Sequence, residues 1–202
     1  MERGQVLERM TLVAVAGAEL EGLWQSGAGV GGGLPIVLAA PHPCLGGNMD
    51  SPVLAEVVWS LARQRHPTLR FNWRGVGASA GERSDRVDDA VADLAAAVDQ
   101  HAPDGPCGLV GYSFGAAVAA RVAATHARVE RVVLVAPALP IDFAALSSTG
   151  VAVAIFAGED DPRDVDAAPF GVHRISRANH SFTAGLLELG RCVAECFPHP
   201  GA

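Results

Sequence analysis

Gly111-Tyr112-Ser113-Phe114-Gly115 is the stretch that decides the fold of this chain. It follows an apolar run over 108–110 and opens an alanine-rich segment over 116–124, a pattern that predicts a strand, a sharp turn and a helix. In this context Gly-x-Ser-x-Gly indicates a nucleophile elbow, whose tight turn holds the central serine in a strained backbone conformation. The alternative is a glycine-lined packing turn with an incidental serine, and the rest of the chain must decide between the two.

Size, composition and charge narrow the class of protein. The chain has 202 residues, half of them apolar, and a formal net charge of −7. This length predicts a single domain over 1–202, and the apolar fraction suits a sheet that is buried on both faces. Because the charge is negative and no cluster of lysines and arginines is present, the sequence argues against a nucleic-acid-binding surface.

The same sequence predicts a cytoplasmic protein with no membrane segment. Its first residues lack a hydrophobic signal core, and no apolar run is long enough to span a bilayer. The scatter of its four cysteines does not resemble a disulfide framework. Cys192 and Cys196 lie one helical turn apart, but no other close ligand pair accompanies them, so we expect buried or half-buried thiols and no metal site.

The order of predicted elements gives the fold class. Strand-like patterns over 6–13 and 19–24 predict an initial hairpin, and the glycine run 27–33 is interpreted as a connection. Further strands are expected at 36–40, 69–73, 107–112, 132–136, 151–157 and 172–176. They alternate with helices that follow Ser51-Pro52, a cap at Ser84, the Ser113 turn and the loop at 179–182. We therefore predict a three-layer α/β/α sandwich around a mostly parallel twisted sheet, with the hairpin as antiparallel edge strands.

A serine nucleophile needs a base and an acid that orients the base, and in this fold they follow in the order serine, acid, histidine. His180 is the expected base, because it lies in a loop between the last strand and the final helix. The other downstream histidines, His126, His173 and His199, fall at a helix end, within a strand and in the tail. The alternative for His180 is a surface histidine that caps the last helix.

The acid comes from the turn Gly158-Glu159-Asp160-Asp161-Pro162. Asp161, at the tip of this turn, is preferred, and Asp160 stays open as the alternative. The developing oxyanion also needs donors. The Phe114 amide, directly after the serine, is one, and the loop after the 36–40 strand should supply another. Since Pro43 has no amide hydrogen, the Cys44 amide is the expected second donor.

Three more polar residues fall near this end of the predicted sheet. Asp50, Arg74 and Ser79 follow or flank strands in glycine-punctuated turns. We expect structural roles for all three, with Arg74 tying loops together through hydrogen bonds.

Together these segments make the chain resemble the α/β-hydrolase superfamily, and within it small lidless bacterial hydrolases akin to dienelactone hydrolases. The resemblance is carried by 41–49, 71–77, 111–115, 158–161 and 179–182, which span most of the chain in the family's order. It implies that Ser113 is the nucleophile, Asp161 the acid and His180 the base. Two positions depart from the pattern: Ala40 where His-Pro-His-Pro would begin, and Asn179 where aspartate often precedes the histidine. The role of Asn179 stays open.

The expected function is that of a serine hydrolase that cleaves a small carboxylic ester or thioester through an acyl-enzyme on Ser113. No cofactor is implied, and a monomer or homodimer acting on a small-molecule acyl substrate is expected. The short segment between 137 and 151 leaves no room for a helical lid. Two alternatives remain: a peptidase or carbon–carbon bond hydrolase with the same triad, and a binding module whose catalysis is vestigial.

Overall fold

A computed structural model describes residues 7–27, 32–163, 165 and 170–197. Within these residues, one sheet holds eight strands in the order β1-β2-β4-β3-β5-β6-β7-β8. The strands are β1 (Arg9–Val15), β2 (Ala18–Gln25), β3 (Ile36–Ala39), β4 (Thr68–Phe71), β5 (Cys107–Tyr112), β6 (Val129–Val135), β7 (Ala152–Gly158) and β8 (His173–Ile175). β2 pairs antiparallel with β1 and with β4, and the remaining neighbours pair in parallel.

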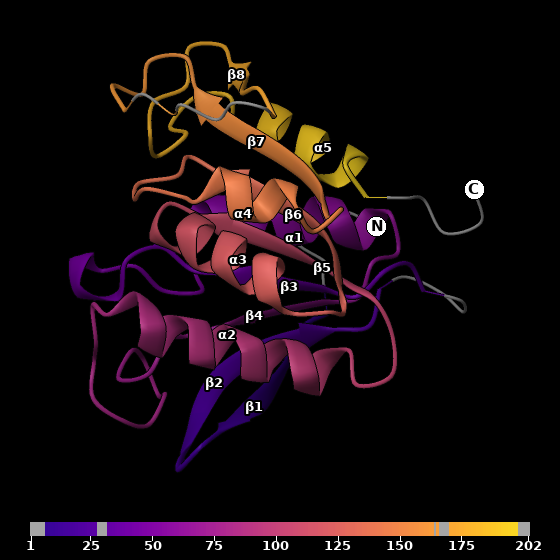
Figure 1. Cartoon of the computed structure of the whole chain (residues 1–202), viewed down its shortest axis with the longest axis vertical. Helices are drawn as coiled ribbons and strands as arrows, with labels where there is room; N and C mark the ends of the chain where they lie inside the picture. Colours follow the sequence, from indigo (N-terminus) through magenta and orange to yellow (C-terminus); the bar gives the residue numbers. More distant parts are fainter. Residues whose placement is uncertain (1–6, 28–31, 164, 166–169, 198–202) are drawn as a thin grey trace.

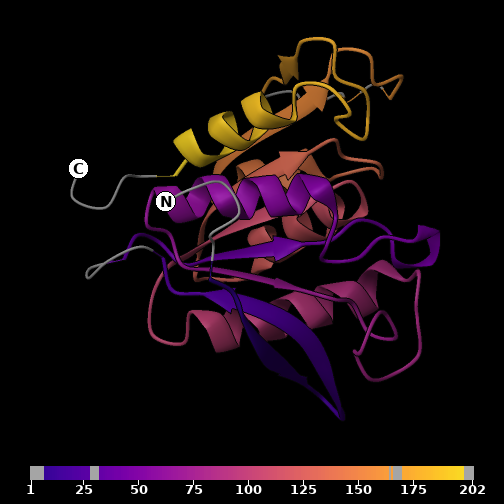
Figure 2. The same ribbon diagram turned by 180° about the vertical axis from the view of Figure 1, so that it is seen from behind.

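Helices cover both faces of this sheet. On one face lie α2 (Val87–His101), α3 (Phe114–Thr125) and the short α4 (Phe143–Ser147), as Figure 1 shows. On the other face lie α1 (Pro52–Arg63) and α5 (Leu186–Glu195), which pack against each other in the view from behind (Figure 2). The predicted three-layer α/β/α architecture, with its antiparallel N-terminal hairpin, is confirmed.

Burial along the strands follows from this layering. All residues of β3 and β5 are buried, because these central strands are covered on both faces and their sequences are almost continuously apolar. β1, at the edge, alternates instead: Val13 is fully buried, whereas Met10 and Leu12 on the other face are largely exposed. The alanine-rich α3 is buried over most of its length, which lets this helix approach the sheet closely.

Local differences from the sequence-based expectation concern the helix ends. Ser51 is the N-cap of α1 and Pro52 its first residue, as expected, although the Ser51 side chain makes no capping hydrogen bond. Ser84 does not cap α2, which begins after Arg86. The Ser84 hydroxyl instead donates to the Asp89 carboxylate at 2.6 Å, so the prediction of a Ser84 cap was wrong.

Some predicted features fall outside the described residues. These are the start of the first strand at Val6, the middle of the glycine run at 28–31, and the tail at 198–202, which includes His199. The segment between β6 and β7 is described in full, and α4, with five residues, is its only helix. The prediction that no helical lid fits there is therefore confirmed.

Candidate active site

Ser113 lies at the sharp turn between β5 and α3, with φ 58° and ψ −113°. This backbone conformation is strained for a residue with a side chain. The flanking glycines make the turn possible. A Cβ at Gly111 would collide with the Gly115 carbonyl, and a Cβ at Gly115 would collide with the Ala39 carbonyl of β3. The Gly-x-Ser-x-Gly stretch is therefore the strand–turn–helix that its sequence predicts, and it holds Ser113 at the carboxyl end of the sheet.

His180 and Asp161 meet Ser113 at this turn. The Ser113 Oγ lies 3.0 Å from Nε2 of His180, and Nδ1 of the same ring lies 2.6 Å from Oδ2 of Asp161. Since an ionised carboxylate only accepts hydrogen bonds, Nδ1 carries a proton, and in the neutral ring Nε2 is left to accept the serine proton. Three side chains that are far apart in the sequence thus form one continuous hydrogen-bonded chain.

The turn after β7 positions the acid. A Cβ at Gly158 would collide with the Ala178 carbonyl, so glycine lets this turn pack directly against the loop that precedes His180. The Asp160 amide donates to the same carbonyl at 2.9 Å. The Asp160 side chain is exposed, whereas the Asp161 side chain is only 2 % exposed and reaches the imidazole. The geometry thus brings Asp161, and not Asp160, to His180.

Arg163 adds a second set of contacts to the acid. Its amide donates to Oδ1 of Asp161 at 3.1 Å, and its guanidinium lies 3.4 Å from the same oxygen. Burial acts to raise the pKa of Asp161, but the hydrogen bonds from His180 and Arg163, together with their charges, outweigh it and hold that pKa below its ordinary value. Asp161 therefore remains an anion beside the imidazole.

The loop that carries His180 is fixed by side-chain hydrogen bonds. Oδ1 of Asn179 accepts from the amides of Ser181 and Thr183, at 3.1 and 3.2 Å, which shapes the loop into a tight turn. The Tyr112 hydroxyl donates to the His180 carbonyl at 3.1 Å. Burial is the main cause that raises the pKa of Tyr112, so the hydroxyl keeps the proton that it donates. Asn179, whose role the sequence left open, thus positions the histidine.

The two other described histidines that follow Ser113 in the sequence lie away from this chain of hydrogen bonds. His126 follows the C-terminus of α3, with Nε2 3.3 Å from Oδ1 of Asp99. His173 is exposed on β8 and stacks on Phe156. Neither contacts Ser113, so His180 is the one of these three described histidines that lies within hydrogen-bond distance of the serine.

The loop after β3 forms the short 3₁₀ helix η1 (Pro43–Leu45). The Cys44 amide, the expected second oxyanion donor, donates instead to Nδ1 of His42 at 3.2 Å. Among the described residues, the His42 amide and the Phe114 amide make no hydrogen bond. The centroids of the His42 and Phe114 rings lie 4.8 Å apart. The prediction from the sequence did not consider that a histidine ring can accept a hydrogen bond from the backbone amide two residues later.

A cleft of about 560 Å³ opens beside Ser113. The β3–α1 loop forms one side of it, and Tyr112, Arg163 and the His180 loop form the other. Leu45 stands at the rim with 83 % of its surface exposed. Arg163 and Tyr112 were not singled out from the sequence. The sequence did contain one signal for Arg163, because a positively charged residue stands two positions after the candidate acid Asp161.

Arg74, Ser79 and Asp50 have the structural contacts that were expected of them. The Arg74 guanidinium lies 2.6 Å from Oδ1 of Asp93, whose side chain is fully buried. Ser79 accepts from the Glu21 amide and donates to the Asn72 carbonyl, each at 2.9 Å. Asp50 pairs with Arg70 at 3.1 Å on the wall of the cleft.

Within the residues that the structure describes, the cysteines belong to no cluster of potential metal ligands. Cys192 and Cys196 are half-buried, and burial raises the pKa of Cys196 to about 11. In the described part of the chain, no group of three or more histidine, cysteine, aspartate or glutamate side chains is arranged to hold a metal ion. Over the same residues, no helix has the length and apolar character needed to span a membrane.

Comparison with known proteins places the chain in a family. The family model Hydrolase_4, described as serine aminopeptidase, S33, matches residues 42–167. An uncharacterized protein from Rickettsia prowazekii is 31% identical over 136 residues, which are 63% of this chain and 57% of that protein. The chain thus spans little more than half the length of this curated relative.

Two solved structures share nearly the whole fold. An alpha-beta serine hydrolase homologue from Coxiella burnetii has a TM-score of 0.79 and 28% identity, over 93% of this chain and 96% of that one. A serine hydrolase without lid from Xanthomonas campestris has a TM-score of 0.76 over 97% and 96% of the two chains, and at 22% identity this likeness concerns the fold alone. With the matched residues extending from the β3–α1 loop across the serine turn to the acid, the chain belongs to the serine aminopeptidase S33 (Hydrolase_4) family of the α/β-hydrolase superfamily.

Proposed function

We propose that this protein is a serine hydrolase that cleaves a small carboxylic ester or thioester through an acyl-enzyme on Ser113. The observation that carries the proposal is the unbroken hydrogen-bonded chain from Ser113 through His180 to Asp161, with distances of 3.0 and 2.6 Å. A serine hydroxyl is a weak nucleophile unless a base takes its proton, and this chain supplies the base in contact with the hydroxyl.

In the first half of the reaction, Oγ of Ser113 attacks the carbonyl carbon while Nε2 of His180 takes the hydroxyl proton. Asp161 holds the imidazole in the tautomer with a proton on Nδ1 and stabilises the imidazolium that forms. The tetrahedral intermediate collapses as the alcohol or thiol leaves with the proton from Nε2. A water molecule then attacks the acyl-enzyme by the same route, releases the acid and restores the serine.

The oxyanion of each tetrahedral intermediate needs amide donors that are not already engaged. The Phe114 amide fits this requirement, because Phe114 is the first residue of α3 and has no partner inside the helix. For the second donor we propose the His42 amide in place of the Cys44 amide. Cys44 would first have to release the His42 ring, to which its amide already donates.

The family description favours a second candidate, hydrolysis of peptides from their N-terminus. Such an enzyme needs an anionic group near the serine to hold the α-ammonium of the substrate. Among the described residues that line the cleft, Asp50 is the acidic one, and it is paired with Arg70. Arg163 also lines the cleft, and its charge is paired with Asp161 at 3.4 Å. Because the acidic residue among the described lining residues is already paired, esters and thioesters are the better candidate substrates.

The replacement Ser113→Ala tests the proposal. The rate of p-nitrophenyl acetate hydrolysis should fall by about 10⁴- to 10⁶-fold, as it does when a triad member is removed. Labelling by a fluorophosphonate probe should disappear together with the activity. Ser147→Ala, which changes an exposed serine of α4, is the matched control and should keep both. Hydrolysis at the original rate by a folded Ser113→Ala protein would refute the assignment.

A substrate panel separates the two candidate functions. Short p-nitrophenyl esters and thioesters should be hydrolysed with a higher kcat/KM than aminoacyl amides that carry a free α-amino group. The reverse order would favour the peptidase. A wild-type protein that is folded but neither labelled nor active would favour a binding module instead.

A further inference from the structure

A second hollow of about 520 Å³ lies next to the cleft. The segment that follows β6 forms most of it, and the rest comes from the chain just after Asp161. Its described lining consists of Pro137, Ala138, Leu139, Pro140, Ile141, Phe143, Arg163 and Val165. Arg163 is the charged side chain among these described residues, so the hollow is predominantly apolar.

Two contacts join this hollow to the candidate active site. Arg163 lines both the hollow and the cleft beside Ser113, so its side chain forms the wall that the two spaces share. The amide of Ala138 points at the Ser113 carbonyl at 3.4 Å, which places the start of the lining segment against the serine turn itself. A molecule bound at Ser113 therefore has the hollow within reach.

The wall between the two spaces has an apolar part. The Arg163 guanidinium is held near Asp161, 3.4 Å from Oδ1, and the side chain is 48 % exposed. With the charged end held by the acid, the methylene groups of the side chain are left to face an apolar ligand. A hydrocarbon chain can thus pass Arg163 without having to bury the guanidinium.

The lining itself favours an apolar occupant. Leu139, Ile141, Phe143 and Val165 pack against the core from one side but are only partly buried. An aliphatic group in the hollow would remove both its own surface and this remaining apolar surface from water, at about 25 cal/mol per Å². The volume also falls in the usual range of sites for small molecules.

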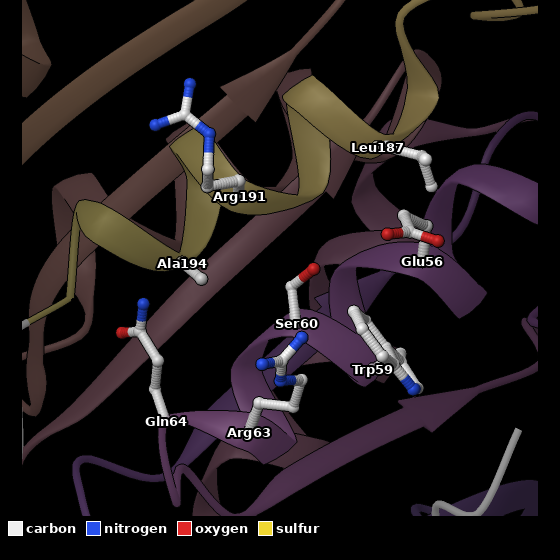
Figure 3. Close-up of a pocket in the computed structure, with 8 residues that line it drawn as sticks. All are labelled: Glu56, Trp59, Ser60, Arg63, Gln64, Leu187, Arg191 and Ala194. Carbon is white, nitrogen blue, oxygen red and sulfur yellow. The ribbon is translucent and has the colours of Figure 1, made fainter. Parts of the chain in front are cut away.

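A third hollow, of about 460 Å³, lacks these features. It lies between α1 and α5, where Figure 3 shows Glu56, Arg63 and Arg191 around it. None of its described lining residues is shared with the cleft. Its rim is charged and it is separate from Ser113, so it serves as a control site. Leu187, on α5, stands at its edge and is 53 % exposed.

We propose that the hollow formed by the segment after β6, Arg163 and Val165 binds the aliphatic acyl chain of the substrate. The carbonyl carbon lies at Ser113 and the chain runs past the methylene groups of Arg163 into the hollow. This inference rests on the proposed function, because it assigns the acyl part of the same substrate. It predicts a preference for acyl chains of medium length over acetyl.

Filling the hollow tests the proposal. In Leu139→Trp the indole should occupy the space, so the ratio of kcat/KM for p-nitrophenyl octanoate to that for the acetate should fall at least tenfold, about the effect of losing one or two methylene contacts. Ile141→Trp is the substitute if Leu139→Trp does not fold. Leu187→Trp, in the control hollow, should leave the ratio unchanged. A folded variant with the wild-type ratio would overturn the proposal.

A binding measurement separates this proposal from the proposed function. In the Ser113→Ala protein, titration calorimetry should show octanoate bound at least tenfold more tightly than acetate. Adding Leu139→Trp should remove that difference. If octanoate binds in this way but no ester is hydrolysed by the wild type, the hollow holds the chain and the hydrolase assignment fails. If octanoate and acetate bind alike, the hollow is not an acyl site, even where ester hydrolysis depends on Ser113.

Discussion

Two buried aspartates meet very different partners in this molecule. Asp93, on α2, is fully buried and receives both the guanidinium and the amide of Arg74. The side chain of Asp161 is 2 % exposed and accepts a hydrogen bond from the imidazole of His180. A guanidinium keeps its proton at all ordinary pH values, whereas an imidazole gains and loses one. Both carboxylates are thus buried and paired, and they differ in whether the partner can exchange a proton.

The two pairs also differ in what the partner of each aspartate contacts beyond that aspartate. The ring of His180 has another nitrogen, 3.0 Å from the Ser113 hydroxyl, so the Asp161 pair continues to the proposed nucleophile in the cleft. The other contacts of Arg74 return to α2, at the Asp89 side chain and carbonyl, so this pair ties the turn after β4 to the helix. The following experiments test whether one pair serves catalysis and the other stability.

The largest effect is expected from Asp161→Asn. An amide in place of the carboxylate favours the wrong imidazole tautomer, so kcat for p-nitrophenyl acetate should fall by about 10⁴-fold. The thermal midpoint should change little, because the amide keeps the shape of the carboxylate. Asp160→Asn, in the exposed neighbour, is the control and should remain near wild type. If folded Asp161→Asn protein kept more than a tenth of the wild-type kcat, Asp161 would have no part in the proposed mechanism.

Arg74→Met should act on stability instead. It leaves the Asp93 carboxylate buried without its cation, which should lower the free energy of unfolding by about 3–5 kcal/mol. Urea unfolding measures this loss, and kcat per folded molecule should stay at the wild-type value. Adding Asp93→Leu should recover much of the stability, since no buried charge then remains.

Arg86→Met is the control for Arg74→Met. The Arg86 side chain is 72% exposed and its contact with Asp89 is 3.9 Å, so its loss should cost less than about 1 kcal/mol. If Arg74→Met costs no more than Arg86→Met, the Arg74–Asp93 pair is not a structural tie.

A smaller effect concerns a half-buried histidine that is not part of the hydrogen-bonded chain at Ser113. Burial is the main cause that lowers the pKa of His101 from 6.5 to about 4, and a hydrogen bond with Pro67 opposes it. Between these two pH values the unfolded state binds more protons at this position than the folded state does, so His101 makes stability fall as the pH is lowered from 6.5 to 4. Over this pH range, the His101 contribution lowers the free energy of unfolding by roughly 3 kcal/mol.

His101→Phe should remove this part of the pH dependence, which urea unfolding at several pH values measures as a shallower loss below pH 6.5 than in the wild type. His173→Phe, in the exposed histidine of β8, should keep the wild-type slope. Parallel slopes for wild type and His101→Phe would show that His101 accepts a proton in the folded state as readily as in the unfolded chain.

The fold was largely predictable because its signals are local. The strand that precedes Ser113 was predicted with both of its ends, Cys107 and Tyr112, and the other strands within a few residues. Apolar runs, glycine turns and alanine-rich helices can be predicted from a short stretch of sequence, because their conformation depends mainly on the residues within it. Ser84 shows the limit of such signals, because a serine before a helix can bond to a side chain as well as to the backbone, and here it bonds to Asp89.

The residues of the candidate site were predicted in outline, but the contacts that hold these residues in place were not. Ser113, Asp161 and His180 stand in motifs whose spacing and order carry information. Tyr112, at the carboxyl end of β5, contacts the loop that carries His180, and no sequence spacing relates the two. The engagement of the Cys44 amide was missed for a similar reason, because it depends on the rotamer of one ring, that of His42.

The sequence by itself determined the order of strands and helices, the strained turn at Ser113, and the motifs that carry Ser113, His180 and the Asp160-Asp161 pair. It could do so because backbone preference, apolar periodicity and motif order are properties of the chain. Only the tertiary structure decided which aspartate faces the imidazole, which amide of the β3–α1 loop is free, and that Arg163 divides two hollows. These facts depend on side chains from loops that follow separate strands and pack together at the carboxyl end of the sheet, and their distances are set only once the chain has folded.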